Sequence, residues 1–152
     1  MIYDAETAPV YGADVYIFTV TGPAEWLNAN DRRNRFAENR LVQQWQEAAA
    51  WAVKAARVPR IEGHVHITAY IIVPDRLKRD PANWQNTAKA VVDGIRDRHR
   101  FHKVGKKRHR YFVRGTIAED DYTHVTGPDM RYRIEPGVKT PKLEVHITRR
   151  EP

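Results

Sequence analysis

The sequence predicts a single α+β domain, in which a mixed β-sheet of about four strands has two main helices packed on it. Three observations predict this fold. Short stretches rich in β-branched and aromatic residues alternate apolar with polar positions, as strands do. Two longer segments repeat their apolar residues at helical spacing. The chain of 152 residues has the usual length of one domain, and proline and glycine separate its segments.

The first part of the chain contains a strand, a polar loop and a long helix. Residues 14–21, DVYIFTVT, end at a Gly-Pro pair and predict the strand. Residues 26–34, WLNANDRRN, predict the loop. Residues 36–57 predict the helix, which Pro59 ends because proline disrupts helical hydrogen bonding. The apolar positions at helical spacing are Leu41, Trp45, Ala48, Ala52 and Ala55.

The second part contains a second helix and three further strands. Residues 63–73, GHVHITAYIIV, alternate between apolar and polar positions and predict a half-buried strand. Pro81 suits a first helical turn, so we expect the second helix over residues 82–97. Residues 125–134 and 143–148 predict the last two strands. The expected order is therefore strand, helix, strand, helix, strand, strand.

Composition limits the classes of function. The 26 lysines and arginines exceed the 19 aspartates and glutamates, so the formal net charge is +7 and the isoelectric point is near 9.8. This balance favours polyanionic partners such as nucleic acid. The chain has no cysteine, which excludes disulfides and thiolate metal sites. No apolar run is long enough to span a membrane, and no signal peptide is evident, so we expect a soluble, intracellular protein.

The second predicted helix has one apolar and one polar side. The polar side is made of short residues that are poor helix formers, which is unusual for a merely solvated face. Lys89 lies beside this side and precedes Asp93 by four residues, the less favourable order for an ion pair. An ordinary amphipathic helix is the simpler interpretation of the pattern taken alone. The positions on the polar side are Asn83, Asn86, Ala90, Asp93 and Asp97.

Acidic residues gather at Asp80, at Asp93 and at residues 119–121, although the protein as a whole is basic. Separately, Asp80 is explained as a helix cap and residues 119–121 as an exposed turn. Together they are the hard oxygen ligands that Mg²⁺ or Mn²⁺ prefers, and a divalent cation would remove their mutual repulsion. We therefore expect metal-assisted phosphodiester hydrolysis. Zinc is the alternative, but no tetrahedral ligand set is evident among His64, His66, His99 and His102.

The most basic stretch is residues 96–114, in which nine of 19 residues are lysine or arginine. We interpret residues 99–115 as a basic insertion, a hairpin or a loop that contacts DNA, and the alternative is a disordered, solvated insert. Trp26 has the best case among the tryptophans for DNA contact, because it lies in the polar loop. The candidate DNA-binding residues are Asn28, Asn30, Arg32, Arg33, Arg79, Asn83, Lys103, Lys106, Lys107, Arg108 and Arg110.

Two segments carry a family resemblance. Residues 78–95, KRDPANWQNTAKAVVDGI, and residues 120–131, DDYTHVTGPDMR, resemble signatures of the RusA-like Holliday junction resolvases. They are especially similar to the phage and prophage branch known from actinobacteria, where a DPxN…TAKAxxDGL run is followed by a DD…HVxGPxMR run. Residues 27–33, LNANDRR, fit the same branch. The matched segments are spread over most of the chain, and their combination is more specific than any one of them.

The resemblance implies a homodimeric endonuclease, dependent on Mg²⁺ or alternatively Mn²⁺, that resolves four-way and other branched DNA junctions. It implies paired symmetric nicks in DNA recombination and repair, because a two-fold dimer presents two sites to a roughly two-fold junction. Asn83 matches the family's asparagine, and Lys89 would stabilise the reacting phosphate or orient a carboxylate. The expected place of action is the cytoplasm of a bacterial host, at the nucleoid when active. The implied metal ligands and catalytic carboxylates are Asp80, Asp93, Asp120 and Asp121.

The chain departs from the better-studied members near the start of this helix. Those members carry Asp-x-Asp-Asn, whereas here Ala82 occupies the place of the second aspartate. The spacing between Asn83 and Lys89 is also three residues longer than the corresponding spacing in those members. Asp93 or Asn86 would compensate for the lost carboxylate in an active nuclease. Two alternatives stay open: a junction or nucleic-acid binder that has lost cleavage, and a basic structural protein of a phage particle or an RNA-binding accessory protein.

Overall fold

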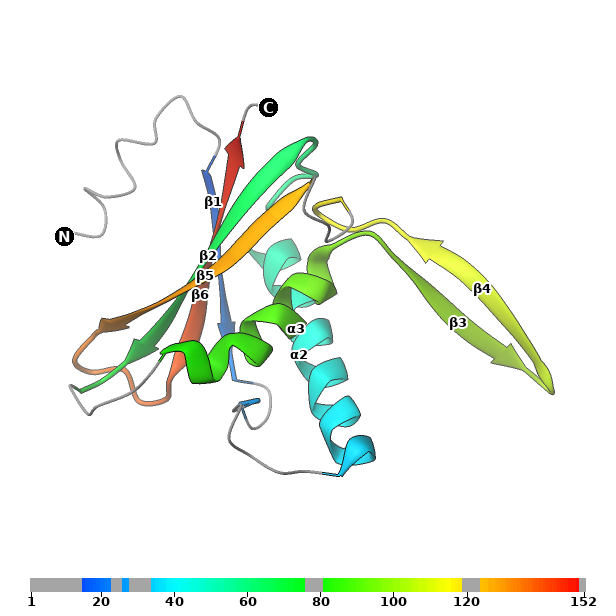
Figure 1. Ribbon diagram of the computed structural model, residues 1–152, viewed down its shortest axis with the longest axis horizontal. Coiled ribbons are helices and arrows are strands. Elements are labelled where there is room, and N and C mark those ends of the chain that lie inside the picture. Colours follow the sequence, from blue (N-terminus) through cyan, green and yellow to red (C-terminus); the bar gives the residue numbers. More distant parts are fainter. Residues whose placement is uncertain (1–14, 23–25, 28–33, 76–80, 119–123, 151–152) are drawn as a thin grey trace.

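The computed structural model describes residues 15–22, 26–27, 34–75, 81–118 and 124–150. Strands and helices alternate along the first part of the chain, and strands alone follow (Figure 1). The elements are β1 (Val15–Thr21), α2 (Arg35–Ala55), β2 (His64–Val73), η2 (Pro81–Trp84), α3 (Gln85–Ile95), β3 (Arg98–Val104), β4 (Lys107–Val113), β5 (Val125–Ile134) and β6 (Lys142–Arg150).

The main sheet has four strands in the order β1-β6-β2-β5. β6 pairs antiparallel with both β1 and β2, whereas β2 and β5 are parallel, so the sheet is mixed. The predicted α+β class, with one mixed sheet and two main helices in a single domain, is therefore confirmed. Because β2 and β5 are parallel, their first residues meet at one end of the sheet and their last residues at the other.

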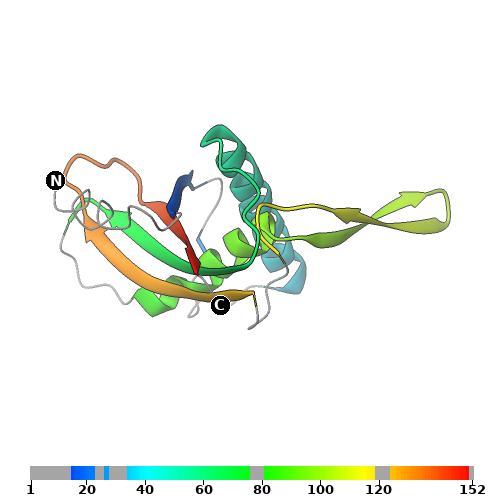
Figure 2. The same cartoon turned by 90° about the horizontal axis from the view of Figure 1, so that it is seen from above.

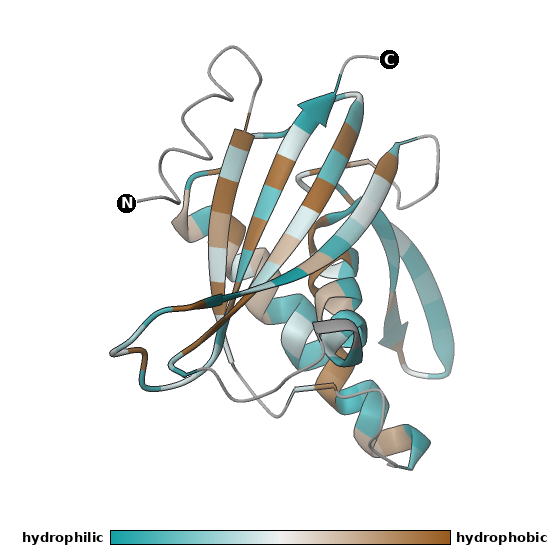
Figure 3. Cartoon of the chain, turned by 60° about the vertical axis from the view of Figure 1, so that its left-hand side comes forward, coloured by the Kyte–Doolittle hydropathy of each residue, from teal (hydrophilic) through white to brown (hydrophobic). Residues whose placement is uncertain are grey.

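Both helices cover one face of this sheet (Figures 1 and 2). The strands alternate accordingly: Val65, Ile67 and Ala69 of β2 are buried, while the residues between them are only half-buried. Figure 3 shows the same alternation of hydrophobic and hydrophilic positions along the strands. Trp45 of α2 is fully buried at the centre of the helical layer. The core is thus closed on the helical side, and the opposite face of the sheet is polar.

The second helix differs from the expected one at both ends. It begins with the 3₁₀ turn η2 and ends at Ile95, because Arg96 is extended and forms a β-bridge with Ile117. Ala90, expected on the polar side, is buried, because α3 packs against α2 as well as against the sheet. The close approach of the helices requires Gly94, since a Cβ there would lie 2.4 Å from the carbonyl oxygen of Gln46.

β3 and β4 form a separate two-stranded sheet that extends away from the rest of the molecule (Figures 1 and 2). Of the two forms expected for the basic insertion, the structure has the hairpin, with its strands at residues 98–113. A two-residue loop joins the strands, and Gly105 adopts the positive φ of 61° that such a tight turn needs.

None of the described helices is long and apolar enough to cross a bilayer.

Candidate nucleic-acid interface

The hairpin, residues 98–113, carries the net charge of the protein. It holds seven of the 26 lysines and arginines and no acidic residue. The other residues of the chain therefore comprise 19 basic and 19 acidic side chains, and their formal charges cancel. A single projecting element with this charge is a local source of positive potential, which attracts a polyanion to that element rather than to the whole surface.

The register of the hairpin divides its side chains between two faces, because residues directly opposite in an antiparallel pair point to the same side. His99 pairs with Phe112, Phe101 with Arg110, and Lys103 with Arg108. We call these three pairs the aromatic face. The opposite face holds the pairs that begin at Arg98, Arg100, His102 and Val104. Cations therefore occur on both sides of the hairpin, and both phenylalanines lie on the aromatic face.

Rings and cations are in contact on the aromatic face. The guanidinium carbon of Arg108 lies 3.9 Å from the ring centroid of Phe101, within the range of a cation–π interaction. The rings of His99 and Phe112 meet edge to face, with centroids 5.5 Å apart. Phe101 is nevertheless 52% exposed and Phe112 54%. These rings are held in place by their neighbours on the hairpin but remain accessible from outside.

A bidentate ion pair holds the base of the hairpin to the body. Both terminal nitrogens of Arg60 bond the two carboxylate oxygens of Asp97, one of them at 2.9 Å. Asp97 also accepts a 2.7 Å hydrogen bond from the Gly115 backbone N–H, and Arg60 donates at 3.0 Å to the Gly115 carbonyl. We call Arg60, Asp97 and Gly115 the clamp. It joins Arg60, four residues before β2, to the residues that flank both ends of the hairpin.

At the base of the hairpin, Asp97 is paired with a cation, whereas Arg98 lies close to two other arginines. The hydrogen bonds from Arg60 and from the Gly115 N–H hold the pKa of the Asp97 carboxyl below its usual range. In contrast, burial lowers the pKa of Arg98, and repulsion from Arg100 and Arg96 lowers it further. An anion at this base would relieve that repulsion, so the base of the hairpin suits a phosphate group.

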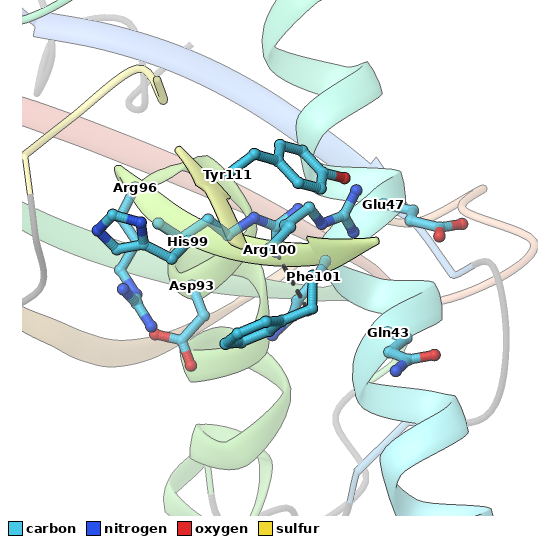
Figure 4. A pocket seen from close by; sticks show the side chains of 10 residues that line it. Gln43, Glu47, Asp93, Arg96, His99, Arg100, Phe101 and Tyr111 are labelled. Atoms are coloured by element: carbon cyan, nitrogen blue, oxygen red, sulfur yellow. Dashed lines mark hydrogen bonds and ion pairs between the residues drawn. The ribbon is translucent and has the colours of Figure 1, made fainter. Parts of the chain in front are cut away.

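A groove of about 550 Å³ lies where the hairpin meets α2 and α3 (Figure 4). Arg98 donates a 3.1 Å hydrogen bond across its floor to Gln46 of α2. The groove combines cations, rings and two acids: Arg96, Arg98, Arg100, His99, Phe101, Tyr111, Glu47 and Asp93 line it, together with Gln43 and Gln46. It therefore joins the basic hairpin to the one predicted catalytic carboxylate that the structure describes.

Asp93 lies at the last turn of α3, with its side chain 22% exposed. Its carboxylate accepts a 3.0 Å hydrogen bond from Nε of Arg96, and Figure 4 shows the two side chains facing each other. Lys89 is exposed one helical turn earlier. Among the described residues, no group of three or more histidine or acidic side chains lies close enough to hold a metal ion. Asp93 is therefore the one predicted metal ligand among the described residues, and it is already paired with Arg96.

Several predicted residues lie outside the described part of the chain: Asn28, Asn30, Arg32, Arg33, Arg79, Asp80, Asp120 and Asp121. Among the predicted residues that are described, Asn83 lies in η2, at the far end of the helix from Asp93. The hairpin brings together Lys103, Lys106, Lys107, Arg108 and Arg110.

The described residues on either side show what the chain contacts before residue 119, after residue 123 and after residue 80. Thr116 donates a 2.6 Å backbone hydrogen bond to Ile95, and the carbonyl of His124 accepts one from Val65 at the start of β2. The chain that precedes residue 119 is thus bonded to the end of α3 that carries Asp93, and His124 is bonded to the start of β2. Pro81 begins at the other end, and the helical rise from there to Asp93 is roughly 20 Å.

Two features of this surface were not expected from the sequence. The clamp joins residues 37 positions apart, and no local pattern pairs Arg60 with Asp97. The aromatic face had a visible signal, since Phe101 and Phe112 interrupt a run of cations. Trp26 packs edge to face against Trp45 and Trp84, with centroids 5.1 and 5.7 Å away, and is partly buried against the core, the more usual role of a tryptophan.

A polar network lies on the sheet face away from the helices. His66 is held between the Thr126 hydroxyl and the Asp129 carboxylate, at 2.7 Å each. Thr126 also lies 3.5 Å from Nε2 of His64. These contacts join β2 to β5 where Gly127 and Pro128 interrupt the regular register. Two of the four histidines that the zinc alternative named, His64 and His66, therefore belong to a hydrogen-bond network between strands.

No family model and no curated protein matches the chain, so the candidate interface is assigned from its own residues.

Proposed function

We propose that this protein binds DNA through the hairpin and the groove at its base, and that it cuts branched DNA in a reaction that depends on a divalent metal. The observation that carries the proposal is the concentration of the net charge of +7 in one projecting hairpin. Phosphate contacts supply most of the affinity of DNA-binding proteins, and both faces of the hairpin offer lysines and arginines for them.

The groove supports the second half of this proposal. It places Asp93 beside Arg96, Arg98 and Arg100, so that a phosphodiester held by the arginines would lie next to a carboxylate. Carboxylate oxygens are the ligands that Mg²⁺ and Mn²⁺ prefer, so Asp93 fits the metal in kind. We propose Asp120 and Asp121 as its partners, because the chain that leads to them is bonded to this end of α3 through Thr116 and Ile117. Asp80 stays a prediction as a further ligand.

Each of these groups has a distinct role in the proposed reaction. Arg98 and Arg100 orient the backbone phosphate, and Lys89 offsets the negative charge that develops on it. Asp93, Asp120 and Asp121 would hold the metal, which would supply Lewis-acid polarisation of the phosphate and a water of lowered pKa. Arg96 must release Asp93 or share it with the metal. A two-fold dimer would place two such sites on the two sides of a junction.

The experiment compares a synthetic four-way junction with its matched duplex and with RNA, at matched salt, with and without Mg²⁺. The proposal expects tight junction binding in either condition and paired nicks only with the metal. Asp93→Asn and Asp121→Asn should bind as the wild type does and lose at least about a hundredfold in cleavage rate. A wild-type rate in either variant would reject the site assignment.

A non-catalytic binder is the second candidate, and the ion pair between Arg96 and Asp93 favours it. An arginine that neutralises the carboxylate does in part what a metal would do, and so leaves less reason for one to bind. This candidate expects junction binding that is indifferent to Mg²⁺ and no nicks at any metal concentration. Preference for RNA over the DNA junction would instead support the accessory RNA-binding alternative.

A further inference from the structure

We propose that the aromatic face of the hairpin recognises the branch point itself, by stacking Phe101 and Phe112 on bases that duplex DNA keeps covered. This inference rests on the proposed DNA binding and names the feature of the substrate that gives selectivity. The cations of the hairpin would attract any nucleic acid, whereas the rings would select a place where the base stack is open.

Phe101 and Phe112 form a pair of exposed rings on the aromatic face. Single exposed apolar side chains are common on protein surfaces, and Phe36 of α2 is one, whereas exposed rings that lie together on one face indicate an interaction site. β3 and β4 contact mainly each other, so no described element covers them. A two-stranded hairpin is only marginally stable in water by itself, and apolar exposure adds to that cost. The arrangement is understandable if the aromatic face is covered when DNA is bound.

The charge around the rings identifies the partner as nucleic acid. On the aromatic face, Lys103, Arg108 and Arg110 accompany Phe101 and Phe112, and the whole hairpin has no acidic residue. A protein partner that covered this face would have to bring many carboxylates, whereas each nucleotide brings one phosphate and one flat base. Arg108 covers the ring of Phe101 at 3.9 Å, and moving to a phosphate would let it expose that ring to a base.

The spacing of the rings fits a base stack. Phe101 and Phe112 belong to cross-strand pairs two positions apart, so their attachment points are separated by about 7 Å along the hairpin. This is about twice the 3.4 Å rise between bases on one strand. Apolar side chains of this kind insert between base steps and open them, and the step is easiest where pairing is already broken. A branch point offers such a step, and an intact duplex does not.

The test measures binding without metal, so that cleavage is not needed. Fluorescence anisotropy gives the affinity for a four-way junction and for its matched duplex, and 2-aminopurine at the branch reports stacking. In Phe101→Ala/Phe112→Ala we expect the preference for the junction over the duplex to fall about tenfold or more. The change in 2-aminopurine fluorescence should disappear. The dependence of affinity on salt should stay the same, because no cation is lost.

Two control variants separate the contributions. Phe36→Ala removes a phenylalanine that is 81% exposed on α2, and it should leave both affinities unchanged. Lys106→Gln/Lys107→Gln should weaken the junction and the duplex equally and reduce the salt slope by about 2. Far-ultraviolet circular dichroism and thermal melting should match the wild type for all variants, because the substituted side chains are exposed.

The outcomes distinguish this inference from the proposed function. If the aromatic variant keeps both the junction preference and the 2-aminopurine signal, the stacking role is wrong and DNA binding stands. If the aromatic variant loses duplex and junction affinity by the same factor, the rings contribute general affinity and the inference is also overturned. If the wild type binds neither DNA, the proposed function itself fails.

Discussion

The hairpin and the helix–sheet body differ in how much apolar surface they bury and in their net charge. The body has a buried core between two helices and one sheet and carries no net formal charge, although Phe36 and Trp51 of α2 are exposed. The hairpin exposes its rings, pairs only two strands and carries the whole net charge of +7. The difference indicates that the body supplies the free energy of folding and that the hairpin is kept for binding, since its charge and exposure both act against folding. The predictions below test that division.

The largest expected effect is the loss of DNA affinity when the hairpin is neutralised. Changing Lys103, Lys106, Lys107, Arg108 and Arg110 to glutamine should weaken binding on the order of a thousandfold at low salt and reduce the salt slope by about 4 to 5. The thermal midpoint should be unchanged or higher, because repulsion within the hairpin is removed. Titrations at three salt concentrations and a thermal melt measure both quantities. A large drop in thermal midpoint would show that the hairpin side chains also stabilise the fold, which contradicts the division between hairpin and body.

The next effect concerns the body alone. Gly94→Ala places a methyl group within 2.4 Å of the Gln46 carbonyl oxygen, so α2 and α3 must separate. We expect the free energy of unfolding to fall by about 3 kcal/mol. Urea unfolding followed by tryptophan fluorescence measures it, because Trp45 lies in the affected core. The folded fraction should still bind DNA with wild-type salt dependence. An unchanged urea midpoint would show that the helices have room to separate at no cost.

A similar or smaller effect is expected at the clamp, where the two regions meet. Asp97→Asn keeps the shape of the side chain but removes the charge that pairs with Arg60, and should cost about 2 kcal/mol. The folded-state pKa of Asp97 is lowered, so its stabilisation is present above the usual pKa of about 3.9. It is lost as the pH falls through the lowered value.

The pH dependence therefore provides the check on the clamp. Urea unfolding of the wild type and of Asp97→Asn should differ by a constant amount between about pH 5 and pH 8. The difference should vanish only below the usual aspartate range. A difference that grows as the pH falls from 8 to 5 would contradict the lowered pKa. Hydrogen exchange of the Gly115 amide, which bonds Asp97 at 2.7 Å, should be faster in the variant.

The smallest expected effect is at Thr87, a buried polar residue of α3. Its hydroxyl accepts a 2.8 Å hydrogen bond from the Leu27 N–H and donates one of 3.1 Å to the Leu27 carbonyl. Thr87→Val would leave both backbone groups buried without this partner and should cost about 1 to 2 kcal/mol. Thr87→Ser keeps the hydroxyl and should cost less. Equal urea midpoints for the two variants would mean that water replaces the hydroxyl.

Local patterns were enough to predict most elements of this fold. The alternation in residues 63–73 predicted β2 to within one residue, and residues 125–134 were predicted at the observed bounds of β5. Both patterns repeat every two residues and need no knowledge of distant partners. The dense run of cations in residues 96–114 likewise indicated a separate basic element, and the hairpin was one of the two forms expected for it.

Only the tertiary structure decided how these elements meet. Ala90 has the same local sequence whether it faces solvent or α2, and the packing of the helices buried it. Thr87 and Leu27 are 60 residues apart, so no periodicity links them. The sequence determined which segments are strands, helices and cations, because each of these depends on neighbours along the chain. The projection of the hairpin, the position of Asp93 at its base and the clamp depend on long-range contacts, which local patterns do not encode.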